Sequence, residues 1–304
     1  MRPLVTLAKI ATSATWAATR PDRFQGHLVP PVLCYHRVLP EAAGAQEPAD
    51  YSVTPQQFEA QMALLKDEGF TSLTLSEYFD AARGLRELAP RSVLVTFDDG
   101  FADNYLVAWP IARRFDVTIN LFICTGLVAG ERVASFAEDN PAAGLSRKGF
   151  PEHWQPLSWE QLREMSDGGV EIGFHSHRHP NLGRMTEDEI ALDAAEGISS
   201  FRQQLEREPE YFAFPFGHYG SYPKRAIDVL TRHGIKLFFT TELGRTPLDG
   251  AGGLVSRIVI HPEDDLKSFR RKLFGGYDWV GKLRRSGYLL RDSYLNSTRK
   301  LSRA

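Results

Sequence analysis

The chain has 304 residues, enough for one α/β barrel or two modest domains, and 42% of them are hydrophobic, which is enough for a sizeable core. Its formal charge of −2 argues against a general nucleic-acid-binding protein. The charge is unevenly placed, because residues 1–25 carry +3, residues 281–304 carry +6, and the segment between them carries −11.

The two basic ends bear on where the protein works. Segment 1–26 starts with a positive charge, but polar residues between Lys9 and Thr15 interrupt the apolar run that a signal peptide needs. No apolar run approaches the roughly 20 residues that span a bilayer. We expect a cytoplasmic protein. Residues 279–295 mix aromatic, leucine and basic residues as an interfacial helix does, so we also expect peripheral contact with the inner membrane, with a solvated tail as the alternative.

Strand-like and helix-like segments alternate along the chain. The strand-like segments are 30–38, 92–100, 117–126, 170–177, 210–217 and 236–242, and the helix-like segments between them are 54–70, 104–115, 158–169, 186–205 and 224–234. Thr54 and Ser158 are suited to cap the first residues of their helices. About seven alternating units predict a mainly parallel sheet closed into a barrel.

One connection, residues 128–156, is long and rich in glycine, proline and charge. Such loops are usually lids, binding loops or disordered segments. Trp154, with Phe150 and Trp159 beside it, could stack on a sugar ring, or these aromatic side chains could simply anchor the loop. Cys34 and Cys124 lie in apolar, strand-like runs and are interpreted as small buried residues without a disulfide.

The strand 92–97 ends in two adjacent carboxylates, Asp98 and Asp99, followed by Gly100. The pair could be a solvated turn. In a low-dielectric pocket, however, two ionised carboxylates repel each other unless a cation, a shared proton or solvent relieves them. A buried Asp98–Asp99 pair would therefore need one of these three partners.

Three histidines, His175, His177 and His179, follow another predicted strand. In a barrel the carboxyl ends of the strands converge on one face, so these histidines and the two aspartates are predicted to meet. Two imidazoles and one carboxylate leave coordination positions open, as in catalytic zinc sites. The second aspartate would then be free to act as a base.

These motifs resemble those of the polysaccharide deacetylases with a NodB homology domain, also called carbohydrate esterase family four. The resemblance rests on "TFDDG", on the "His-Ser-x-x-His" element in "FHSHRH", and on "VLCYHRV", "PLSWEQLREMSDGGVEIGFHSHRHPNL" and "FAFPFGHYG", and covers roughly residues 30–262. It implies a distorted (β/α)7 TIM-like barrel. We therefore expect a segment 1–26, a deacetylase barrel 27–280 as a single domain, and a basic tail 281–304.

The resemblance also implies roles for individual residues. Asp98 corresponds to the general base, and the metal ligands correspond to Asp99, His175 and His179. His177, between the ligands, is assigned a supporting or solvent-facing role, with ligation as the alternative. The motif "FAFPFG" makes Phe214, Pro215 and Phe216 candidates for the wall of the substrate groove.

The sequence departs from the family pattern in two places. Many members carry an arginine where this chain has Ala213, so another cation, Arg178 or Arg257, would have to replace it, or the base is tuned differently. The late histidine that supplies a catalytic acid in many relatives is matched only loosely by His261, which could equally be a surface histidine. His36, at the end of the first predicted strand, is a further candidate to face the pocket.

The function that the resemblance implies is removal of N-acetyl groups from amino sugars of a polysaccharide or oligosaccharide. The cofactor would be a divalent metal ion, most plausibly zinc, and the partner an acetylated glycan rather than a nucleic acid. Two alternatives remain open. One is a catalytically silent, deacetylase-like protein that binds glycan or serves in assembly, and the other is an amidohydrolase barrel that uses His175 and His177 as paired ligands.

Overall fold

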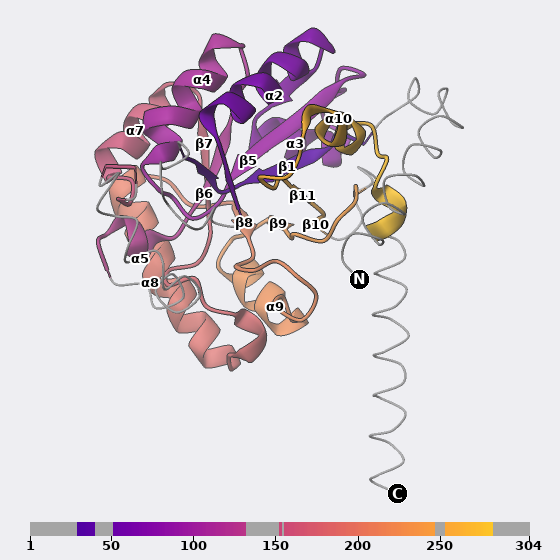
Figure 1. Cartoon of the computed structure of the whole chain (residues 1–304). Helices are drawn as coiled ribbons and strands as arrows, with labels where there is room; N and C mark the ends of the chain where they lie inside the picture. The colour runs from indigo at the N-terminus through magenta and orange to yellow at the C-terminus, as the bar shows by residue number, and fades with distance from the viewer. Residues whose placement is uncertain (1–28, 40–50, 132–151, 154, 247–252, 282–304) are drawn as a thin grey trace, which may run out of the picture.

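The computed structural model describes residues 29–39, 51–131, 152–153, 155–246 and 253–281, which form a curved parallel sheet surrounded by helices (Figure 1). Trp154 and Phe150 lie outside the described residues, as do most of the two basic ends. The predicted boundaries at residues 26 and 280 stay predictions.

The main sheet contains nine strands, and every pairing in it is parallel. Its strands are β1 (Val32–Tyr35), β4 (Thr71–Leu73), β5 (Ser92–Phe97), β6 (Asn120–Ile123), β7 (Glu171–Phe174), β8 (Tyr211–Ala213), β9 (Leu237–Phe239), β10 (Leu254–Val255) and β11 (Ile258–Val259). Two short strands, β2 (Arg37–Val38) and β3 (Ser52–Val53), pair separately. The sequence patterns missed β4 and β10, which have three and two residues and are too short to show a period.

The order of the strands makes the sheet an irregular barrel. It runs β10-β9-β8-β7-β6-β5-β1-β11, and β4 pairs with the start of β5. The two outermost strands, β10 and β11, are consecutive in the chain and are joined by Ser256 and Arg257. The sheet therefore closes on itself through a covalent connection, which confirms the predicted distorted TIM-like barrel.

The helices lie outside the sheet (Figure 1). They are α2 (Pro55–Asp67), α3 (Leu75–Ala82), the π-helix η2 (Asn104–Ala108), α4 (Trp109–Arg114), α5 (Thr125–Val128), α7 (Trp159–Asp167), the 3-10 helix η5 (Leu182–Arg184), α8 (Glu187–Leu205), α9 (Lys224–Arg232) and α10 (Leu266–Leu273). Thr54 and Ser158 cap α2 and α7 through reciprocal capping boxes, as predicted. None of the helices described here is both long enough and apolar enough to cross a membrane.

Side chains of β5 alternate between the two faces of the sheet. Val93, Val95 and Phe97 belong to the large core cluster that also contains residues of α2, α4 and α7, whereas Leu94 belongs to the cluster inside the barrel. Because a strand has a period of two residues, the next position on the inner face after the buried Thr96 is Asp98. The strand pattern itself thus turns Asp98 toward the barrel interior.

Candidate active site

Four polar side chains follow the inward faces of their strands to the carboxyl end of the barrel. His36 comes just after β1, Asp98 after β5, His175 after β7, and Arg257 between β10 and β11. Each is placed there by the same two-residue period, and the parallel direction of the strands brings the four ends together. The predicted meeting of the two aspartates with the histidine cluster is confirmed by the contacts between them.

Asp98 is held by a buried arginine. Both terminal nitrogens of Arg257 donate to the carboxylate, one to each oxygen, at 2.6 Å, and its Nε donates to the Thr240 carbonyl at 3.0 Å. Neither Asp98 nor Arg257 is more than 1% exposed. Burial alone would raise the pKa of Asp98, but the guanidinium outweighs burial and holds that pKa well below its usual range. Asp98 is therefore ionised at neutral pH.

Arg257 takes the place of the arginine that the family motif would put at Ala213. Of the two replacements predicted, Arg178 instead pairs with Glu131 and Glu196, away from Asp98. Ala213 is fully buried and carries only a methyl group, and the guanidinium that reaches Asp98 enters from the β10–β11 junction.

Asp99 faces the two histidines that were predicted as its fellow ligands. Its Oδ1 lies 3.5 Å from Nε2 of His175 and 3.6 Å from Nε2 of His179. Two ligands that are each about 2.0 Å from a tetrahedral zinc ion lie about 3.3 Å apart. Among the described residues none donates a hydrogen bond to this buried oxygen, so the site offers an unpartnered carboxylate oxygen to a cation. The distance from Asp99 to each of the two histidines therefore fits a shared metal ion.

The backbone around these ligands is bent into conformations that are rare for residues with side chains. Asp99 has a φ of 78° and His179 a φ of 50°, both in the left-handed region. Such conformations cost roughly 1–3 kcal/mol each and persist where surrounding contacts enforce them, often at functional sites. Here they aim both side chains at a common point.

The two histidines predicted as ligands differ in their electrostatic surroundings. Nδ1 of His175 lies 2.8 Å from the Ala213 carbonyl, which can only accept, so Nδ1 carries a proton and Nε2 is the nitrogen that faces Asp99. Burial lowers the pKa of His175, but the charges of Asp98 and Asp99 outweigh burial and raise it in the metal-free protein. Burial lowers the pKa of His179 to about 4, which keeps that ring neutral at physiological pH.

His177 points to a different place. Its Nδ1 is 2.9 Å from the Thr125 hydroxyl and its Nε2 is 3.3 Å from a carboxylate oxygen of Glu131. This agrees with the supporting role predicted for it. It also removes the geometric basis for an amidohydrolase site, because His175 and His177 do not face the same point.

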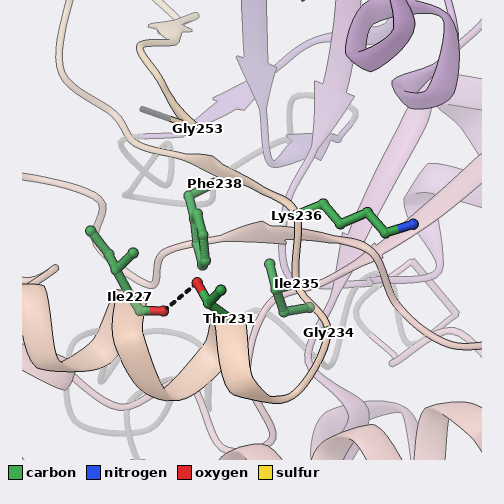
Figure 2. Close-up of a pocket in the computed structure, with 7 residues that line it drawn as sticks. All are labelled: Ile227, Thr231, Gly234, Ile235, Lys236, Phe238 and Gly253. Carbon is green, nitrogen blue, oxygen red and sulfur yellow. Dashed lines mark hydrogen bonds between the residues drawn. The ribbon is translucent and has the colours of Figure 1, made fainter. Parts of the chain in front are cut away.

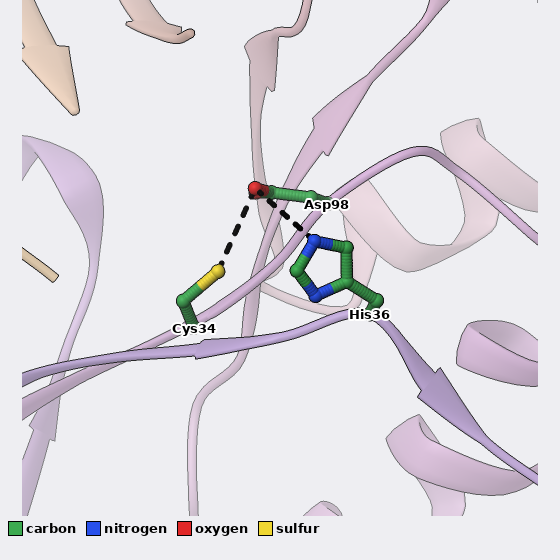
Figure 3. A group of neighbouring side chains, drawn as sticks. All are labelled: Cys34, His36 and Asp98. Carbon is green, nitrogen blue, oxygen red and sulfur yellow. Dashed lines mark hydrogen bonds and ion pairs between the residues drawn. The ribbon is translucent and has the colours of Figure 1, made fainter. Parts of the chain in front are cut away.

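Cys34 and His36 form a second group with Asp98 (Figure 3). The Cys34 thiol lies 3.6 Å from Oδ2 of Asp98, and Nε2 of His36 lies 4.0 Å from the same oxygen. Cys34 is buried as predicted, but it is also a polar neighbour of Asp98, which its apolar sequence surroundings did not indicate. Burial raises the pKa of this thiol well above its ordinary value, so it remains protonated and can donate to Asp98.

Tyr51 connects His36 with His261. Its ring lies 4.9 Å from the His36 ring and 5.8 Å from the His261 ring, and the residue is 49% exposed. Tyr51 thus lies beside both histidines. Tyr51 was not predicted as a site residue, although an aromatic residue three positions before the Thr54 cap of α2 is a signal that could have indicated it.

The residues predicted to form the groove wall separate into two groups. Phe216 is partly exposed and its ring lies 5.0 Å from the ring of His179. Pro215 is buried. Phe214 requires correction, because it is only 1% exposed and stacks on Phe238 in the outer core, the face opposite to Ala213.

A separate pocket of about 540 Å³ lies between α9 and β9 (Figure 2). It is lined by Ile227, Thr231, Gly234, Ile235, Lys236, Phe238 and Gly253. Residues 234–236 come just before β9, so this pocket opens at the amino end of that strand, whereas the aspartates and histidines follow the carboxyl ends of theirs. None of the predicted site residues lines it.

Residues 86–238 match the family model for polysaccharide deacetylase. The matched segment is half of the chain and contains Asp98, Asp99, His175 and His179. The chain therefore belongs to the polysaccharide deacetylase family.

Known proteins agree with this assignment. The polysaccharide deacetylase homologue YxkH of Bacillus subtilis strain 168 is 24% identical over 76% of this chain and 71% of its own length. Poly-beta-1,6-N-acetyl-D-glucosamine N-deacetylase of Staphylococcus aureus MRSA252 is 24% identical over 77% of this chain and 76% of its own. The Escherichia coli K12 protein of the same name is matched over only 38% of its length. The structure of the Streptococcus pyogenes deacetylase PplD shares the fold, with a TM-score of 0.67, 24% identity and coverage of 81% of this chain and 98% of that one.

Proposed function

We propose that this protein is a metal-dependent hydrolase that removes N-acetyl groups from amino sugars of a polysaccharide or oligosaccharide. The observation that carries the proposal is that the two adjacent aspartates have different partners. The charge of Asp98 is balanced by the two hydrogen bonds from Arg257, while Asp99 presents an unpartnered oxygen to two imidazoles.

Asp99, His175 and His179 would hold the ion, which we propose to be zinc because a carboxylate and two neutral imidazoles are a donor set that zinc favours. A divalent ion bound there supplies polarisation of the acetyl carbonyl and a more acidic water. Cys124 lies close to Asp99 and His175 as well, but its thiol donates to the His175 carbonyl at 3.3 Å. Burial raises the pKa of Cys124, so it stays a neutral donor and not a thiolate ligand.

Asp98 would accept the proton of the attacking water. A general base has to be ionised and correctly aimed, and the two hydrogen bonds from Arg257 meet both needs. Since Asp98 is buried, the same guanidinium also stabilises its charge, which would otherwise be costly in the barrel interior. After the transfer, the remaining contacts with Cys34 and His36 keep the carboxyl group in place.

The departing amine needs a proton, and two histidines are placed to give it. His261 was predicted from the sequence, and His36 is added by its position 4.0 Å from Asp98, with a buried Nδ1 that accepts or donates no hydrogen bond among the described residues. Because His36 lies beside Asp98, we propose it as the principal donor. Burial lowers the pKa of His36, so its ring would receive the proton that Asp98 takes from the water before passing it to the amine. His36→Ala should then lower acetate release at saturating zinc more than His261→Ala does.

Two exposed or half-exposed aromatic rings flank the site, Tyr51 beside His36 and Phe216 beside His179. Flat apolar faces on either side of a polar centre suit a sugar ring, which has apolar C–H faces and polar edges. Together with the names of the relatives from S. aureus and E. coli, this supports an N-acetylglucosamine polymer as the substrate class.

Acetate release tests the proposal. The purified full chain, stripped with a chelator and reloaded with zinc, cobalt or nickel, should release acetate from poly-β-1,6-N-acetylglucosamine, chitin oligosaccharides or peptidoglycan, and the stripped protein should not. An absence of release from all three glycans by protein that has bound metal would favour the silent, glycan-binding alternative. That alternative was supported by the absence of the motif arginine, and the contact of Arg257 with Asp98 removes this support.

A further inference from the structure

The loop that carries His175 and His179 has an unusual backbone. Ser176 and His179 both adopt left-handed conformations, with φ values of 69° and 50°. A chain without support would leave these conformations, because each costs roughly 1–3 kcal/mol. Something outside the loop must therefore hold it.

The support on one side comes from Asp193 in α8. Its two carboxylate oxygens accept hydrogen bonds from consecutive backbone amides, from His177 N at 3.0 Å and from Arg178 N at 3.1 Å. Asp193 is only 7% exposed and lies on the buried face of α8, between Ile190 and Ala194. A carboxylate on the apolar face of a helix is costly unless it is hydrogen-bonded, and these two amides provide its hydrogen bonds.

The other side of the loop is held by α5. Gly126 N donates to the His177 carbonyl at 2.9 Å, and the Thr125 hydroxyl meets Nδ1 of His177 at 2.9 Å. A Cβ at position 126 would lie 2.7 Å from that carbonyl, so the contact requires glycine. The loop is clamped between the two helices. Glu196 of α8 and Glu131, just after α5, pair with side chains of the loop, whereas Asp193 is a buried carboxylate that bonds to its backbone.

We propose that Asp193 is a positioning residue for the metal site, which holds the 175–179 loop in the conformation that brings His175 and His179 to Asp99. The inference rests on the proposed metal site and adds a residue that touches neither metal nor substrate. Without the carboxylate, the buried His177 amide and the partly buried Arg178 amide lose their acceptors, and the loop gains the freedom to relax away from its left-handed residues. Metal binding then has to order the 175–179 loop again, and the cost of ordering it lowers the affinity for the metal.

The expected size follows from groups that orient metal ligands in other proteins, where loss of one costs about 10- to 100-fold in metal affinity. In the full chain, the zinc Kd measured by competition with a chromophoric chelator should rise by about that factor in Asp193→Ala. The zinc Kd of Asp193→Asn should lie between those of the wild type and Asp193→Ala. Its single side-chain oxygen can accept a hydrogen bond from one backbone amide, while its NH2 group faces the other. Asp188→Ala, an exposed carboxylate on the same helix, is the matched control and should bind zinc as the wild type does.

Zinc affinity and thermal stability are measured on the same samples. If Asp193 served stability alone, the midpoint of unfolding would fall while the zinc Kd of the folded protein stayed the same, and the inference would be overturned. The expected result is a graded rise in Kd from Asp to Asn to Ala, with acetate release recovering at saturating zinc. If Asp193→Ala does not fold, Asp193→Asn decides. Failure of the wild type to bind zinc would contradict the metal site itself, whereas equal affinity in wild type and variants would contradict only the role of Asp193.

Discussion

Asp98 and Asp99 are neighbours in the chain but face different partners. Asp98 continues the inward face of β5 and meets Arg257, whereas the left-handed backbone at Asp99 turns the next carboxylate toward His175 and His179. One change of backbone conformation thus separates two chemically identical side chains into the proposed base and the proposed metal ligand. This separation can be tested because asparagine keeps the shape of aspartate but cannot ionise.

Asp99→Asn should lose bound metal and acetate release together, since an amide is a weaker partner for a dication. Asp98→Asn should keep the metal and lose acetate release by roughly 10²- to 10⁴-fold, the usual contribution of a general base. Elemental analysis and an acetate assay on the same preparations distinguish the two. Loss of metal in Asp98→Asn with retention in Asp99→Asn would reverse the assignment.

His179 should make the stability of the metal-free protein depend on pH. Its pKa is about 4 in the folded protein and about 6.5 when exposed. Between these values the unfolded chain binds a proton that the folded chain does not, so the contribution is complete above pH 6.5 and is lost as the pH falls toward 4. The loss is at most about 3 kcal/mol, at 1.36 kcal/mol per pH unit.

Urea unfolding of the metal-free wild type and of His179→Gln between pH 7 and pH 4 measures this dependence. The variant has no ionisable group at the position, so its free energy of unfolding should fall less steeply with decreasing pH. Parallel curves for the two proteins would show that His179 is not held neutral by burial.

At the scale of elements, α8 must approach the sheet closely for Asp193 to reach the loop. Gly197 permits this approach, because a Cβ there would lie 2.5 Å from Cζ of Phe174 in β7 and 3.0 Å from the Thr125 hydroxyl. Replacement of a helical glycine with alanine normally stabilises a helix by about 1 kcal/mol. At position 197 the close contacts outweigh this gain, so alanine is expected to lower the stability of the protein.

Gly197→Ala should therefore destabilise the protein by about 1–3 kcal/mol, the usual cost of overpacking a core, measured by denaturant unfolding. It should also weaken zinc binding, because α8 carries Asp193 and has to move outward. Ser199→Ala, at an exposed position of the same helix, serves as the control and should leave both quantities almost unchanged. A stabilised Gly197→Ala protein would mean that α8 can shift without cost.

At the scale of the whole molecule, the basic ends suggest a place of action. We propose that the protein is cytoplasmic and contacts the inner membrane peripherally through residues 1–25 and 281–304, which carry +3 and +6. These residues lie outside the described part of the chain, apart from Gly281. The proposal rests on charge and composition.

Flotation with liposomes that contain anionic lipid tests this proposal. The full chain should float at low salt and less at moderate salt, because screening weakens the attraction of exposed charges. A protein that ends at residue 280 should float less than the full chain at both salt concentrations. Equal recovery of the two proteins would show that the tail is simply solvated.

The sequence determined the alternation of strands and helices, the capping of α2 and α7, and the meeting of "DDG" with "HSHRH". These features follow from short-range periods and from the rule that parallel strands end on one face. It left open which cation replaces the motif arginine and where His177 points. It placed Phe214 wrongly, because the motif resemblance did not take account of the strand period that turns this ring into the outer core.

Only the tertiary structure decided those points. Arg257 is 159 residues from Asp98 in the chain and reaches it because the closure of the barrel at β10 and β11 brings the two together. Asp193 reaches the ligand loop because α8 packs closely on β7 and α5. Local patterns specify which face of an element a residue occupies, but contacts between distant elements depend on how the whole sheet curves and closes, and no local period encodes that curvature.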